Sequence, residues 1–244
     1  MSNNAIIRIA MWSGPRNLST AMMRSFGARG DCFCIDEPFY AAYLALTGLE
    51  HPMRAEILDK HPSDAEEVAR YLADGEVPAP LFYQKHMTHH MVDGIPRGWM
   101  KSVRHAFLIR RPERVLASYA KKVEAVSLED IGFKQQAELF ARAADERGEA
   151  PVVVDSDDIL ADPAGVLEKL CAGLGIAFTP AMLSWAPGPK PEDGAWAPHW
   201  YDAVWKSTGF AKPNPNMPDL PVELARIAEQ ATPFYEQVAV CKVC

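Results

Sequence analysis

The segment from Ala5 to Phe26 constrains the fold most, because it joins a buried strand to a helix through a very short loop. The apolar run 5–11 predicts the strand, and the helical side is marked by Leu18, Ala21, Met22 and Phe26. This geometry aims unpaired backbone N–H groups and a helix N-terminus at an anion. Arg16 adds a permanent charge that can fork onto phosphate or sulfate oxygens. The sequence therefore predicts an oxyanion-binding loop near residue 16.

The loop does not have the pattern of an ATP or GTP phosphate loop. That pattern, G-x-x-x-x-G-K-[ST], would place a second glycine and a lysine where this chain has Ser19 and Thr20. The loop taken alone also fits an ordinary surface turn before a capped helix.

A second strand, basic turn and helix follow, with the strand predicted at 106–109 and the helix at 112–125. Pro112 suits the first turn of a helix, where a missing N–H is harmless. Arg110 stands at the end of the strand, and Ser118 stands eight residues later, about two helical turns along. A strand-end arginine and an inward hydroxyl can together hold one phosphate.

The remaining pattern alternates strands with helices. Further strands are predicted at 32–35, 81–87 and 151–155, with helices at 133–144 and from Pro163 to Leu174. This order favours an α/β fold with a doubly wound, mainly parallel sheet that binds ligands at the carboxyl ends of its strands. We expect residues 1–244 to form one domain. The aromatic and Pro-rich segment 186–220 is expected to cover its cleft, or alternatively only one sheet face.

Both anion motifs resemble those of the sulfotransferase family. The run Pro15 to Thr20 resembles its 5′-phosphosulfate loop, although Asn17 and Leu18 stand where the family usually has Ser-Gly. Arg110 and Ser118 resemble its 3′-phosphate pair, and residues 152–175 resemble its later strand and helix. Ser156 replaces a tyrosine that often touches the nucleotide, so that contact is not carried over.

The resemblance implies a P-loop NTPase-like sulfotransferase architecture and 3′-phosphoadenosine 5′-phosphosulfate as co-substrate. The residues it assigns to that nucleotide are Arg16, Asn17, Leu18, Ser19, Thr20, Arg110 and Ser118. Lys206 to Gly209 could form a cover over the nucleotide, or an ordinary loop.

Three residues are catalytic candidates. Asp36-Glu37-Pro38 resembles the Glu-Pro that carries the base in related enzymes, so Glu37 is the first candidate, with a plain turn carboxylate as the alternative. Lys85 matches the family's lysine that contacts the transferring group. His86 suits general-base work by its ordinary pKa, but a shift of one residue turns a strand side chain to the other face. His89 and His90 are expected to be structural.

Composition restricts the partners. A net charge of −7 disfavours nucleic acid and polyanionic acceptors. The aromatic content suggests that the acceptor is a small organic molecule. No apolar run reaches membrane-spanning length, and no leader pattern stands at the N-terminus, so a cytoplasmic protein without membrane contact is expected. Sulfuryl transfer does not require a divalent metal, and none is expected. A zinc site built from Cys32, Cys34, Cys241 and Cys244 is a weak alternative.

The leading hypothesis is an enzyme, a sulfotransferase that acts on a hydroxyl or amine of a small acceptor. Two alternatives stay open: a nucleotide or small-molecule kinase with a degenerate loop, and a non-catalytic nucleotide-binding relative. The sequence predicts neither the identity of the acceptor nor the oligomeric state.

Overall fold

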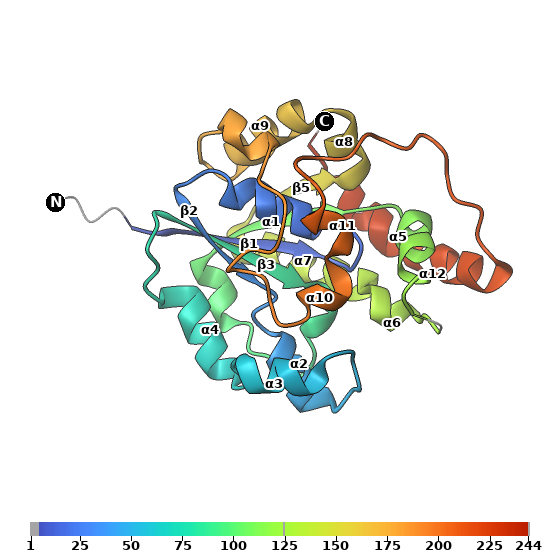
Figure 1. The fold of residues 1–244 in the computed structure, drawn as a ribbon, viewed down its shortest axis with the longest axis horizontal. Helices are drawn as coiled ribbons and strands as arrows, with labels where there is room; N and C mark the ends of the chain where they lie inside the picture. Colours follow the sequence, from blue (N-terminus) through green and yellow to red (C-terminus); the bar gives the residue numbers. More distant parts are fainter. Residues whose placement is uncertain (1–4, 124, 244) are drawn as a thin grey trace.

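A computed structural model describes residues 5–123 and 125–243, whose strands form one parallel sheet (Figure 1). The strand order is β2-β3-β1-β4-β5. The strands are β1 (Ile7–Ser13), β2 (Cys32–Asp36), β3 (Leu81–Met87), β4 (Arg104–Ile109) and β5 (Val152–Asp155). All four strand pairs are parallel, so the carboxyl ends of the strands meet at one edge of the sheet. The predicted α/β fold is confirmed.

Helices pack on both faces of this sheet (Figure 1). The longer ones are α1 (Ser19–Gly27), α2 (Tyr40–Thr47), α3 (Arg54–Lys60), α4 (Ala65–Asp74), α5 (Pro112–Tyr119), α7 (Phe133–Arg147), α9 (Pro163–Gly173) and α12 (Val222–Ala239). Short ones are η1 (Thr88–His90), η2 (Gly98–Ser102), α6 (Leu128–Ile131), α8 (Ser156–Ala161), η3 (Pro180–Leu183), α10 (Ala197–Trp200) and α11 (Asp202–Trp205).

The core lies on both sides of β1, because alternate side chains of a strand point to opposite faces. Ile9 and Met11 join the apolar cluster under α1 and α9. Ala10 and Trp12 join the cluster formed with α4, η2, α7 and α12. These four side chains of β1 are fully buried, as the continuous apolar run predicts.

Two elements differ from the sequence prediction. The helix predicted over 112–125 ends at Tyr119, before the lysine-rich run that continues the chain. Helix α12 has no predicted counterpart, since Pro233 lies inside it and proline normally interrupts a helical pattern. Helix α9 follows its prediction closely, and the side chain of Asp162 accepts a hydrogen bond from the backbone N–H of Gly165 at 3.0 Å.

Among the helices in the described residues, none has the length and apolar character that crossing a membrane requires.

Candidate active site

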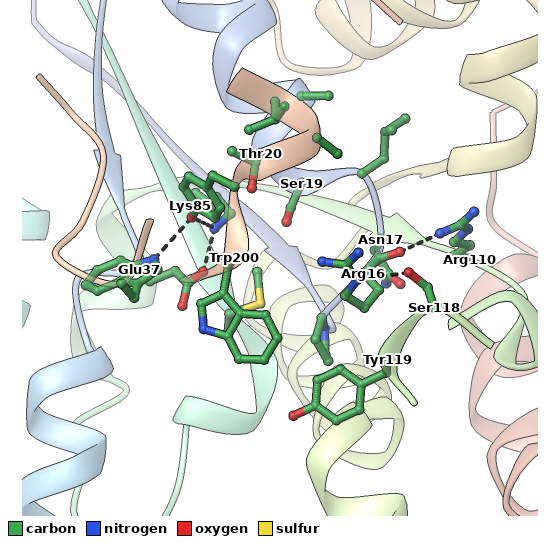
Figure 2. Close-up of a pocket in the computed structure, with 18 of the residues that line it drawn as sticks. Arg16, Asn17, Ser19, Thr20, Glu37, Lys85, Arg110, Ser118, Tyr119 and Trp200 are labelled. Carbon is green, nitrogen blue, oxygen red and sulfur yellow. Dashed lines mark hydrogen bonds and ion pairs between the residues drawn. The ribbon is translucent and has the colours of Figure 1, made fainter. Parts of the chain in front are cut away.

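A cavity of about 320 Å³ opens at the carboxyl edge of the sheet (Figure 2). The loop after β1, the turn after β2, the end of β3, the residue after β4 and the end of α5 all contribute to its lining. Every nucleotide-binding candidate named from the sequence lines this cavity, as do Glu37 and Lys85. One edge of a parallel sheet thus brings together residues that are far apart in the sequence.

The loop after β1 has a left-handed backbone although it lacks the glycine of the resembling family. Arg16 has φ 62° and Leu18 has φ 70°, a region that favours glycine. Leu18 is partly buried against the apolar cluster on the α1 side of the sheet, which offsets the unfavourable backbone angle. Gly14 is needed for a different reason, because a Cβ there would lie 2.5 Å from the carbonyl oxygen of Ile131.

The two anion motifs form one site. Nη1 of Arg110 donates to the carbonyl oxygen of Arg16 at 2.7 Å, and Nε of Arg16 donates to the Ser118 hydroxyl at 2.9 Å. Burial lowers the pKa of both guanidinium groups, which nevertheless stay charged near neutral pH. Nε of Arg110 is buried without a hydrogen-bond partner in the described structure, so a donor is left over for a ligand.

Ser156 hydrogen bonds to the backbone of both motifs, a contact that the sequence does not predict. Its hydroxyl oxygen lies 2.8 Å from the carbonyl oxygen of Asn17 and 2.9 Å from that of Ile109. The residue that stands in place of the family's tyrosine therefore connects the two loops to each other. Asn17 donates to the carbonyl oxygen of Leu108 at 3.3 Å, and its own Oδ1 has no hydrogen-bond partner among the described residues.

A buried acidic network lies at the other end of the cavity, around Lys85 (Figure 2). Its Nζ contacts Oδ1 of Asp36 at 2.7 Å, Oε1 of Glu37 at 2.6 Å and the Tyr201 hydroxyl at 2.8 Å. The Tyr201 hydroxyl donates in turn to Oδ2 of Asp36 at 2.6 Å. The three protons of the ammonium group match these three partners.

This network places the pKa of Glu37 in the range useful for a base. Burial raises it, the charge of Lys85 lowers it and that of Asp36 raises it, with a net pKa of about 7. Burial lowers the pKa of Lys85, but the negative charges of Asp36 and Glu37 have the larger combined effect. They hold the pKa of Lys85 well above its ordinary value. Glu37 can therefore accept a proton near neutral pH while Lys85 keeps its own.

His86 does not belong to this site. It lies on β3 next to Lys85 but faces the opposite side of the sheet, where its ring stacks on Trp12 with centroids 4.5 Å apart. It is absent from the cavity lining, and burial lowers its pKa to about 3. The shift of one residue from the family's pattern has turned it away, so we do not assign it a catalytic role.

Aromatic side chains complete the cavity, and the motifs do not reveal them. Tyr40, Tyr119, Trp196, Trp200 and Tyr201 all line it. Three of these lie in the segment 186–220, whose aromatic density was the available signal. His89 and His90 also line the cavity, and His90 stacks on Tyr40 with centroids 4.5 Å apart. Of the predicted cover, Ser207 and Gly209 reach the lining.

No group of three or more metal-ligating side chains occurs in the residues that the structure describes. Cys32, Cys34 and Cys241 are free thiols, and Cys244 lies outside the described residues.

Comparison with known proteins identifies the family. The sequence model of the sulfotransferase domain matches residues 7–241. Two Arabidopsis thaliana proteins, branched-chain-amino-acid aminotransferase-like proteins 2 and 1, are 36% and 37% identical to this chain over 227 residues. The match covers 93% of this chain and 40% of each relative, so the chain spans about two fifths of the length of these relatives.

Solved structures support the fold. The sulfotransferase domain from the curacin biosynthetic pathway matches with a TM-score of 0.56 at 15% identity, covering 93% of this chain and 98% of that one. A sulfotransferase from Alicyclobacillus acidocaldarius matches with a TM-score of 0.53 at 13% identity, covering 97% and 95%.

Proposed function

Because the chain belongs to the sulfotransferase domain family and is therefore a transferase enzyme, we propose that its donor is 3′-phosphoadenosine 5′-phosphosulfate and its acceptor a small molecule with a hydroxyl or amine. The observation that carries this proposal is the bond between Arg110 and Arg16 inside the cavity that also contains Glu37. Two anion-binding motifs and a carboxylate base are what sulfuryl transfer from a doubly phosphorylated nucleotide needs.

The polar groups of the cavity fit such a nucleotide. The N-terminus of α1, with the hydroxyls of Ser19 and Thr20, suits the phosphosulfate end. Arg110 and Ser118 suit the 3′-phosphate. The buried and unpartnered Nε of Arg110 is a donor that an anion would satisfy, which supports a bound phosphate at this position.

The chemistry follows from the placement of charge. When bound, the nucleotide supplies an activated sulfuryl group linked to the 5′-phosphate. Glu37 takes the proton of the acceptor group as the acceptor atom bonds to sulfur. The sulfur–oxygen bond to the 5′-phosphate breaks, and its electron pair stays on the phosphate oxygen. Arg16 and the loop N–H groups stabilise that charge, so 3′,5′-bisphosphoadenosine is released.

We also treat residues 1–244 as one domain in which the segment 186–220 covers the cavity. Arg24 on α1 supports this, since its Nη2 contacts both carboxylate oxygens of Asp193 at 2.5 and 2.7 Å. Tyr201 supports it from the other side of the cavity through its bonds to Lys85 and Asp36.

Ligand-induced thermal shift tests the proposal and separates it from the alternatives. We expect 3′,5′-bisphosphoadenosine without magnesium to raise the melting temperature far more than ADP does, because only the former engages both anion motifs. A larger shift with ADP and magnesium would instead support a kinase. Sulfuryl transfer that is lost in Glu37→Gln while bisphosphate binding is retained would separate an enzyme from a non-catalytic binder.

A further inference from the structure

Charge is divided between the two ends of the cavity. Arg16 and Arg110 lie at one end, and Glu37 and Lys85 lie at the other (Figure 2). Lys85 is enclosed by two carboxylates and the Tyr201 hydroxyl, which match its three N–H donors. Lys85, Asp36 and Glu37 together therefore carry one net negative charge when both carboxylates are ionised. All three N–H groups of Lys85 are in use, so none is left to bind the acceptor substrate.

The histidines at this end do not add positive charge. His51, His89 and His90 line the cavity. Burial lowers the pKa of each of them below its ordinary value, to about 3 for His89, so all three are neutral at pH 7. Among the described lining residues, the acceptor end has no cation that could pair with an anionic acceptor.

Flat side chains line the cavity. Trp200 lies parallel to Tyr119 with ring centroids 6.3 Å apart, and at the acceptor end Tyr40 stacks on His90. Such walls bind planar hydrophobic groups and tolerate a cation against their faces. A carboxylate or phosphate brought here would lose its water next to Glu37 without gaining a positively charged partner.

We propose that the acceptor is an aromatic alcohol or phenol that carries no negative charge. This inference rests on the proposed function, since it concerns the part of the cavity that the nucleotide leaves open. It names the acceptor's charge and shape: neutral or cationic, with a planar body beside the hydroxyl that reacts.

Three phenols that differ at one end test it by binding alone. Protein saturated with 3′,5′-bisphosphoadenosine is titrated calorimetrically with 4-propylphenol, tyramine and 3-(4-hydroxyphenyl)propanoate, which are neutral, cationic and anionic. We expect the first two to bind at least about tenfold more tightly than the propanoate. Equal affinities, including no binding by any of the three, or tighter binding of the propanoate overturns the proposal.

This design keeps the proposed function separate. If the bisphosphate itself does not bind, the proposed donor is wrong, and the phenols are compared on the protein alone, where the same order is expected.

His51 offers a variant with a matched control. Its side chain lines the acceptor end, and its Nδ1 lies 3.0 Å from the Tyr40 hydroxyl. His51→Arg introduces the missing cation, so the affinity for the propanoate relative to tyramine should rise about tenfold with bisphosphate binding unchanged. His51→Gln, which adds no charge, should keep the original order. An unchanged order in His51→Arg contradicts the charge argument.

Discussion

Arg110 and Arg16, which stand 94 residues apart in the sequence, are joined by a hydrogen bond of 2.7 Å from Nη1 to the main-chain carbonyl oxygen. Ser118, from the helix that follows Arg110, accepts a second bond from Nε of Arg16 at 2.9 Å. The two anion motifs therefore share contacts, and a change in one should be felt by ligands that span both.

Arg110→Ala should weaken the binding of 3′,5′-bisphosphoadenosine about 10- to 100-fold, the usual loss for one charge-assisted contact to phosphate. Calorimetric titration measures it. The affinity for adenosine 5′-monophosphate should change little, because that ligand lacks the 3′-phosphate. Arg110→Lys should restore only part of the loss, since lysine cannot fork onto the phosphate. An equal loss of affinity for both nucleotides would show that Arg110 does not bind the 3′-phosphate.

The acid limb of the profile of kcat/KM against pH should reflect the ionisation of Glu37. A base must be deprotonated, and burial holds the pKa of this carboxyl at about 7. The value of kcat/KM should therefore fall as the pH drops through about 7 and level off above it. Glu37→Gln should lose about 10²- to 10⁴-fold in kcat and show no such limb. A wild-type profile that stays flat down to pH 5 contradicts this assignment.

Tyr201 and Asp36 should move that limb in opposite directions. The Tyr201 side chain lowers the pKa of Glu37, so Tyr201→Phe should shift the limb to higher pH. The negative charge of Asp36 raises the same pKa, so Asp36→Asn should shift the limb to lower pH. Both variants should bind 3′,5′-bisphosphoadenosine as the wild type does. Shifts in the same direction would contradict the effect on Glu37 that is assigned here to one of the two residues.

Asp193→Ala should lower the free energy of unfolding by about 3 kcal/mol, because it leaves the buried guanidinium of Arg24 without its main partner. Urea denaturation measures the loss. Glu146→Gln is the matched control: its partner Arg142 lies one turn away on the surface of α7, and such pairs contribute less than about 0.5 kcal/mol. Equal effects of the two changes would show that the Arg24 pair does not hold the segment 186–220.

His86→Phe should leave the pH profile in place. The residue stacks on Trp12 in the core, and phenylalanine keeps a flat ring there. We expect kcat within a few-fold of the wild type, with any loss appearing as a lower melting temperature. Disappearance of the acid limb would instead show that His86 acts as the base.

Local patterns predicted much of the site. An apolar run, a basic turn and a helix start lie close together in the sequence, so the loops around Arg16 and Arg110 could be recognised from a few residues each. The strand 81–87 was predicted with the bounds that the structure has. Successive side chains of a strand point to opposite faces of the sheet, which explains why Lys85 lines the cavity and His86 does not.

Contacts between distant segments could not be predicted in this way. Tyr201 reaches Lys85 across 116 residues, and Arg24 reaches Asp193 across 169. Nothing near any of these residues marks its partner, because a long-range pair depends on how whole elements pack. Helix α12 was not predicted because Pro233 interrupts its helical sequence pattern.

Leu18 has a wider consequence. A left-handed backbone angle costs a residue other than glycine roughly 1–2 kcal/mol, and here leucine keeps that angle while packing its side chain on the core. The shape of such a loop can thus survive the loss of the residue type that usually marks it. Search patterns that insist on glycine at this position will pass over chains of this kind, and backbone geometry is the better guide for finding them.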